Sequence, residues 1–558
     1  MNKHFTDKLI SISKSIEKCE LDTVYLDLFS LNLIETHVQY SKAGDFILFA
    51  KNHKNIPLEK HNALIYELLE YNAMLNLDIL SKDIKIFFNL LINQITDKLL
   101  LIIETFDKED MLINLYVLSS YIIQFHQRTR LILRGDLKLV NIKSINLLES
   151  SLLEAIESSN GIMDHDIDSI QGLDKAIIQY LFALIMKPKL SKSHLYNFNR
   201  DAFRQMYYLS YSAITLISQR ELVMSRVFQN KNIKIINGVI SFEDNNWHKV
   251  LNKFKKEIVD ERTKMPFEDL PKIADELKNN FKKNLGFDFD YLNSLLEFES
   301  YSIEKEKRLA HIFSKINLVS LVQNVTKCKE DEAECLIDYL TLRISDHSEY
   351  LDPLDKYRYR LLEKPLLQLE ISSQSIYLLS LPLLINSVQL LSSRLMYNLI
   401  PECTKDNSDI IKNNIKNETV LTASNIFKIH TNKVFTNAKD FNYKGKKFSF
   451  NCEYDILTVI NDVLIVSECK DITYKFTTFG LKKDIGKTID YINEIAYEMI
   501  EIKNNLIVLE DIFQTKINKI IPLIVFKNHN ISINTNFNKK GVEITSLNLL
   551  NDWINRTI

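Results

Sequence analysis

Two acids and a lysine near the C-terminus have the types and spacing needed for metal-assisted hydrolysis. Asp455 is followed after twelve residues by Glu468, and Lys470 comes two residues later. Carboxylates bind hard divalent cations, and a nearby ammonium group can orient a water molecule or offset charge in a transition state. These residue types favour hydrolysis of a phosphodiester.

A β-hairpin is predicted to position these side chains. Apolar runs on both sides of Asn461-Asp462 predict two strands joined by a two-residue turn. The register that follows places Asp455 opposite Glu468 and Glu453 opposite Lys470, with all four side chains on one face because alternate residues share a face. We interpret Glu453 as a salt-bridge partner of Lys470.

Two carboxylates side by side need a positive charge between them. Opposed like charges destabilise a sheet unless one acid is protonated or a cation is bound. Oxygen ligands suit Mg²⁺ or Mn²⁺, whereas the six cysteines are scattered without zinc-ligand spacing. The sequence therefore predicts a Mg²⁺ or Mn²⁺ site at Asp455 and Glu468.

The pattern Asp455 followed by Glu468-Cys469-Lys470 resembles the PD-(D/E)XK nuclease superfamily, whose motif is an acid on one strand and acid-x-Lys on the next. The resemblance covers about 150 residues at the C-terminus, and no Pro precedes Asp455. It implies a restriction-endonuclease-like fold, with Asp455, Glu468 and Lys470 as catalytic residues. It also implies that the two acids bind the metal together with the backbone carbonyl of Cys469.

The same resemblance suggests further contacts. The first helix of the family often supplies another acid to the metal, for which Glu418 is the candidate. The helix after the lysine strand often reaches nucleic acid, and a basic turn could contact phosphates. The candidate nucleic-acid-binding residues are Lys483, Lys487, Tyr491, Lys446 and Lys447. Each of these is also compatible with an ordinary solvated face.

The rest of the chain is predicted to be mainly helical. Ten Gly and nine Pro among 558 residues favour long helices, because both residues interrupt helices. We expect several domains: a helical region over 1–230, a second helical region over 231–400 opened by a hairpin at Asn237-Gly238, and an α/β nuclease-like domain with a central mixed sheet over 405–558.

Within that last domain the apolar patterns alternate between helical and strand periods. The polar, Asn-rich segment 401–417 marks its boundary. The expected elements are a helix over 409–430, strands over 433–470, a helix over 481–503, strands over 520–526 and 542–545, and a helix over 547–555.

Composition narrows the partners and location. A net charge of −2 gives no general attraction to polyanions, so nucleic acid must be bound by local patches. Scattered cysteines and an N-terminus without an apolar leader favour the cytoplasm. The apolar run 375–400 is interpreted as a buried helix pair, so no membrane span is expected. The segment 480–488 has the wrong glycine spacing for a nucleotide-binding loop.

We therefore expect a Mg²⁺-dependent endonuclease, acting on DNA in preference to RNA. Large helical regions fused to such nucleases resemble restriction or antiphage defence effectors, in which the helical part recognises a target or regulates the nuclease. Two alternatives remain open: an inactive nuclease-like module that binds nucleic acid, and a helical sensor or scaffold acting through protein partners or through homo-oligomerisation.

Overall fold

The computed structural model divides the chain into two compact units. One contains 1–75, 88–217 and 278–403, and the other contains 76–87, 218–277 and 404–558. This division differs from the expected split at 230, because 218–277 groups with the C-terminal part. The described residues are 56–133, 164–186, 199–224, 232–242, 271–296, 310–343, 364–371, 374–396, 417–471, 478–535 and 538–558, with a few single positions between them.

The first unit is built largely of helices, as its sequence periodicity predicts. Long helices bury apolar stripes; along α5, for example, Leu115, Leu118 and Ile122 are almost completely buried. Gly135, a residue type that often ends a helix, lies outside the described residues. The described helices before residue 400, of which α4, α8 and α10 each have one end in the second unit, are α3 (Ile56–Tyr71), α4 (Ile84–Ile103), α5 (Lys108–Leu133), α7 (Asp164–Ile185), α8 (Arg200–Val223), α10 (Pro271–Leu285), α11 (Phe289–Leu296), α13 (Lys315–Thr326), α14 (Glu330–Leu340) and α15 (Leu381–Met396).

The second region, 231–400, which was predicted to be helical after its opening hairpin, contains further strands. A four-stranded sheet with the order β4-β7-β6-β5 crosses it, and the expected helix pair over 375–400 is a strand followed by one helix, α15. The strands are short, and apolar runs of this length cannot be assigned from periodicity alone. They are β4 (His311–Ser314), β5 (Thr341–Arg343), β6 (Leu366–Ile371) and β7 (Gln374–Leu379).

The hairpin expected at Asn237-Gly238 is confirmed. It joins β2 (Ile233–Ile236) to β3 (Val239–Phe242), and β1 (Leu77–Ile79) adds a third antiparallel strand. Asn237 and Gly238 both have positive φ, the conformation that a two-residue turn requires.

The C-terminal part contains the mixed sheet that the sequence predicts. Its strand order is β12-β11-β10-β9-β8, with antiparallel pairing from β8 to β10 and parallel pairing from β10 to β12. The strands are β8 (Val434–Tyr443), β9 (Lys446–Ile460), β10 (Val463–Lys470), β11 (Lys519–Phe526) and β12 (Glu543–Ser546). Helices cover both faces, as expected of an α/β domain.

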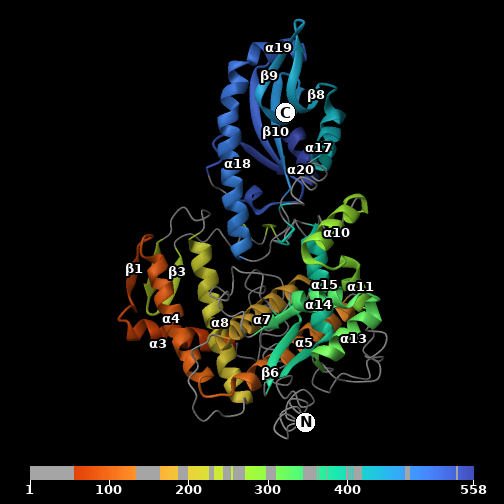
Figure 1. The fold of residues 1–558 in the computed structure, drawn as a ribbon. Coiled ribbons are helices and arrows are strands. Elements are labelled where there is room, and N and C mark those ends of the chain that lie inside the picture. Colours follow the sequence, from red (N-terminus) through yellow and green to blue (C-terminus); the bar gives the residue numbers. More distant parts are fainter. Residues whose placement is uncertain are drawn as a thin grey trace. The chain divides into compact units, whose positions relative to one another are not determined.

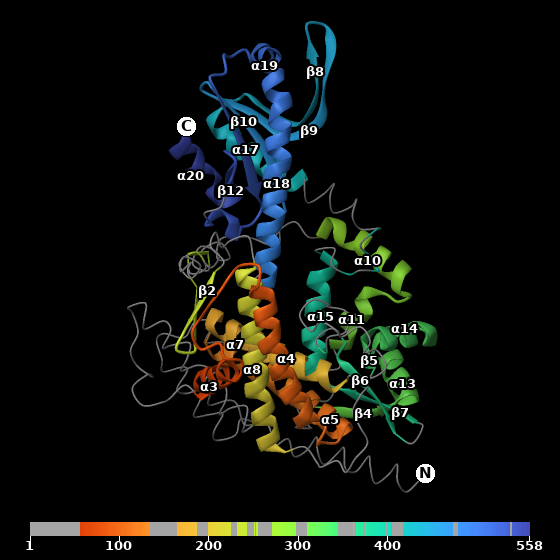
Figure 2. The same ribbon diagram turned by 90° about the vertical axis from the view of Figure 1, so that its left-hand side faces the viewer.

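Different helices cover the two faces of this sheet. The helix α18 (Thr478–Asn504) runs along one face, and α17 (Asn417–His430) and α20 (Leu547–Thr557) lie on the other (Figure 1). In the turned view, α18 stands in front of the strands (Figure 2). The short helices α19 (Leu506–Phe513) and η5 (Ile531–Ile533) were not expected from the sequence.

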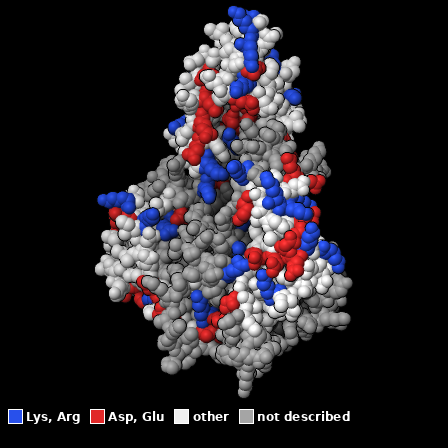
Figure 3. Space-filling model, viewed as in Figure 1, with Lys and Arg blue, Asp and Glu red and all other residues white. Residues whose placement is uncertain are grey.

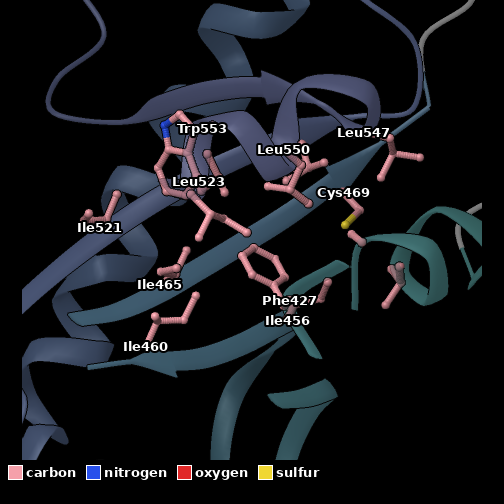
Figure 4. Packing of buried hydrophobic residues seen from close by; sticks show 14 of the residues in the cluster. Phe427, Ile456, Ile460, Ile465, Cys469, Ile521, Leu523, Leu547, Leu550 and Trp553 are labelled. Atoms are coloured by element: carbon pink, nitrogen blue, oxygen red, sulfur yellow. The ribbon is translucent and has the colours of Figure 1, made fainter. Parts of the chain in front are cut away.

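The face under α17 and α20 holds a dense apolar core. Phe427 of α17 and Trp553 of α20 lie over Ile456, Ile465 and other strand residues (Figure 4). Phe427 has no exposed surface. This core fixes the β9–β10 hairpin from behind and leaves its opposite face to α18.

One helix of the described residues, α4, is long and apolar enough to cross a membrane. Core helices of soluble proteins pass the same test of length and composition. Ile95, Leu99 and Ile103 of α4 have no exposed surface, so this helix is weak evidence for a membrane span.

Candidate active site

The β9–β10 hairpin has the register that its sequence predicts over its turn and central part. Ile460 pairs with Val463, and the pairing continues to Ile456 with Ser467. Asn461 at the turn has a φ of 56°, a left-handed conformation that Asn tolerates well. The hairpin therefore brings Asp455 and Glu468 to its far end on the same face.

Asp455 takes part in the sheet through its side chain. Its carboxylate oxygen Oδ2 accepts a hydrogen bond of 2.8 Å from the backbone N–H of Cys469. The pairing of β9 with β10 ends at Ile456 and Ser467, so Asp455 and Glu468 lie just beyond the last pair and this side-chain bond joins the strands there instead. With no exposed surface, the Asp455 carboxylate is held rigidly beside Glu468.

Glu468 and Lys470 form an ion pair, with Lys470 Nζ donating to Glu468 Oε2 at 3.0 Å. Burial, with the charge of Asp455, raises the pKa of Glu468 to about 7. Burial disfavours charged Lys470, but attraction to Glu468 outweighs it, so the pKa of Lys470 is raised. The predicted salt bridge from Glu453 to Lys470 is wrong: Glu453 is exposed, because a bulge in β9 interrupts its pairing with β8.

The helix α18 contributes an aromatic ring to the site. Lys470 Nζ lies 4.8 Å from the centre of the Tyr491 ring, within the range of a cation–π interaction. Tyr491 is half-buried. The sequence singled out Tyr491 as a contact for nucleic acid, and the structure places it against Lys470.

No family model, curated protein or solved structure matches this chain. Its function must therefore be inferred from the geometry of the chain itself.

Two glutamates of α18 that the sequence did not single out also lie here. Glu501 accepts hydrogen bonds from Asn451 N at 2.8 Å and from the Tyr454 hydroxyl at 3.2 Å, which ties α18 to β9. Glu498 interacts electrostatically with Asp455 and Lys470. The helical spacing of Tyr491, Glu498 and Glu501 would have shown that they share a face, but only the fold shows which strand residues that face meets.

The structure gives Glu418 a basic partner. It is on α17, which packs against the opposite face of the sheet. Lys527 Nζ donates to its Oε2 at 2.7 Å. Asp471 interacts with both Glu418 and Lys527. Burial raises the pKa of Asp471, although the positive charge of Lys527 opposes this shift. In this arrangement Glu418 is a salt-bridge partner of Lys527.

The remaining predicted nucleic-acid contacts are on the surface. Lys483 and Lys487 are exposed on the first turns of α18. Lys446 and Lys447 are exposed at the start of β9, where Lys447 pairs with Asp440 at 3.0 Å. Along α18 the colours in Figure 3 change from lysine at its lower end to acids farther along. Lysines lie at both ends of this helix, with Lys483 and Lys487 in its first turns and the exposed Lys503 in its last turn.

The donor set at the hairpin end fits a hard divalent cation. Asp455 and Glu468 are buried carboxylates whose mutual repulsion is offset at present by Lys470. Among the described residues, no three His, Cys, Asp or Glu side chains are placed to enclose an ion by themselves. Two carboxylates with water and substrate oxygens are sufficient for Mg²⁺, which usually keeps several waters.

Proposed function

We propose that this protein is a divalent-metal-dependent nuclease, most simply a DNA endonuclease, whose C-terminal part has the PD-(D/E)XK fold. The observation that carries the proposal is the convergence of Asp455, Glu468 and Lys470 at one end of the β9–β10 hairpin. A protein that only binds nucleic acid has no use for two buried, adjacent carboxylates, because their repulsion costs stability.

Each residue of the motif has a distinct role in this proposal. Asp455 and Glu468 would hold the cation together with the Cys469 carbonyl, and a bound cation supplies a Lewis acid that polarises a phosphoryl oxygen. Lys470, steadied by Glu468 and Tyr491, orients the attacking water and offsets charge in the transition state. Burial strengthens these interactions because little water screens them.

The substrate is expected to approach along the basic end of α18. Lys483 and Lys487 precede Tyr491 on this helix, and Lys446 and Lys447 add a second positive segment. All four would contact backbone phosphates, so they would contribute affinity without sequence preference. In this proposal the helical unit recognises the target or regulates cutting, as a restriction or defence effector would require.

Cleavage of plasmid DNA and of RNA by the purified chain tests the proposal. We expect nicking or linearisation of plasmid with Mg²⁺ or Mn²⁺, none with chelator, and slower attack on RNA. Cutting that persists in excess chelator would contradict a metal mechanism. Binding of DNA without any cutting, with either metal, would favour the alternative of a binding module.

Metal affinity should depend on pH through Glu468. Its pKa of about 7 in the cation-free protein means that a cation must displace a proton below this pH. The affinity for Mn²⁺, measured by calorimetry from about pH 5.5 to about pH 8.5, should rise by nearly tenfold per unit up to pH 7 and then level off.

The same shift predicts the pH dependence of folding. Because the folded pKa of Glu468 lies above its ordinary 4.5, the cation-free protein should lose stability as pH rises from 4.5 to 7. Glu468→Gln should remove this loss and most of the metal affinity. An affinity for Mn²⁺ that does not change across the whole range would show that Glu468 does not titrate at the site.

A further inference from the structure

The stripe of α18 that faces the site carries three acids whose environments differ. Glu494, Glu498 and Glu501 recur at three- and four-residue spacing after Tyr491, which contacts Lys470. Such spacing places all of them on one side of the helix. The helix α18 therefore carries acids on the same side as the residue that contacts Lys470 of the hairpin.

Two of the three acids are already accounted for. Glu494 is exposed, so its charge is solvated. Glu501 is bonded through both oxygens: Oε1 accepts from Asn451 N at 2.8 Å, and Oε2 accepts from the Tyr454 hydroxyl at 3.2 Å and lies 3.6 Å from Cys452 Sγ. Glu501 therefore has a structural role, as an anchor between α18 and β9.

Glu498 is different. Its oxygen Oε2 is buried and makes no hydrogen bond with any described residue. A buried carboxylate oxygen without a donor is costly, and the cost rises when other carboxylates are close. Asp455 and Glu468 both interact electrostatically with Glu498, and Lys470 is the positive charge that favours its ionised form.

We propose that Glu498 holds a water molecule coordinated to the cation that Asp455 and Glu468 bind. This inference rests on the proposed nuclease function and names Glu498, where the sequence offered Glu418, as the further acid of the site. Glu418 is on α17, which packs on the other face of the sheet, and Lys527 is its partner at 2.7 Å. Glu498 is on α18, whose Tyr491 lies against Lys470, and its backbone carbonyl accepts a hydrogen bond of 3.3 Å from the Tyr454 hydroxyl.

The proposal gives each group at the site a partner. Lys470 now balances the acids from its position against Glu468. A divalent cation adds two positive charges, and a water molecule coordinated to it would donate to Glu498 Oε2. Carboxylates that hold coordinated water are known to tune metal affinity strongly. Because Glu498 comes from α18, the position of this helix would also set the affinity of the site.

Titration of the full chain with Mn²⁺ tests the assignment without any cleavage. The affinity for Mn²⁺ is measured by isothermal calorimetry and by the loss of the electron paramagnetic resonance signal of free Mn²⁺. Wild type is compared with Glu498→Gln, Glu501→Gln and Glu418→Gln. We expect Glu498→Gln to weaken Mn²⁺ binding by about tenfold or more. Glu501→Gln, one turn away, and Glu418→Gln should remain within about twofold of wild type.

The outcomes separate this inference from the proposed function. If wild type and Glu498→Gln bind Mn²⁺ with equal affinity, the role of Glu498 is overturned and the nuclease proposal stands. If only Glu418→Gln weakens Mn²⁺ binding, Glu418 of α17 is the further acid of the site and Glu498 is not. Wild type without Mn²⁺ binding would overturn both proposals. Circular dichroism checks each variant for folding, and Glu498→Asp, which keeps the charge, should recover part of the affinity.

Discussion

Replacing Lys470 or Asp455 by alanine should lower the rate of DNA cleavage by roughly a thousandfold or more, which corresponds to about 4 kcal/mol of transition-state stabilisation. The causes differ. Lys470→Ala removes the ammonium group but leaves both carboxylates, so Mn²⁺ binding should persist. Asp455→Ala removes a carboxylate and the acceptor for Cys469 N–H, so Mn²⁺ binding should be lost too. Single-turnover cleavage of labelled plasmid measures the rates of the two variants.

Glu453→Ala is the matched control for these substitutions. Glu453 lies on the same strand, is exposed and is not the partner of Lys470. Its removal should leave the cleavage rate within about twofold, as is usual for a surface change. Full activity in both Lys470→Ala and Asp455→Ala would remove the assignment of the site.

Phe427→Ala should destabilise the C-terminal part by about 3–5 kcal/mol, because it removes a large buried ring and leaves a cavity. The ring has no exposed surface and packs in the cluster that contains Ile456 and Trp553. Urea unfolding followed by the fluorescence of Trp553, in a Trp247→Phe background, reports on this core because the chain has two tryptophans.

The neighbouring residue Leu421 provides the comparison for this change. Leu421 is on the same helix, α17, with 58% of its surface exposed. Leu421→Ala should change the free energy of unfolding by less than about 0.5 kcal/mol. Equal effects of the two substitutions would mean that α17 does not pack on the sheet through Phe427.

The C-terminal elements were predictable because their patterns are local. Asn461-Asp462 between two apolar runs predicts the turn, and the turn fixes the register of the hairpin. The strands β6 and β7 of the other unit were missed for the opposite reason. Each has only six residues, and so short a stretch does not separate a strand from part of a buried helix.

The site was predictable only in part. Asp455, Glu468 and Lys470 belong to one hairpin, so sequence spacing relates them. Tyr491 and Glu498 reach the same place from a helix that follows β10, and their position depends on how that helix crosses the sheet. The place of Glu418 depends on the fold in the same way: its helix was expected in the correct order, but the face that the helix covers is a property of the whole fold.

The parallel pairing of β10 with β11 affects when the site is completed during synthesis. A nascent chain that has emerged through residue 470 already carries Asp455, Glu468 and Lys470. Yet β10 then lacks the neighbour that pairs with it from Lys519 to Phe526, and α18 has not yet emerged from the ribosome. Both must emerge before the carboxylates are enclosed. A partly synthesised chain therefore carries the motif without the environment that the proposed activity needs.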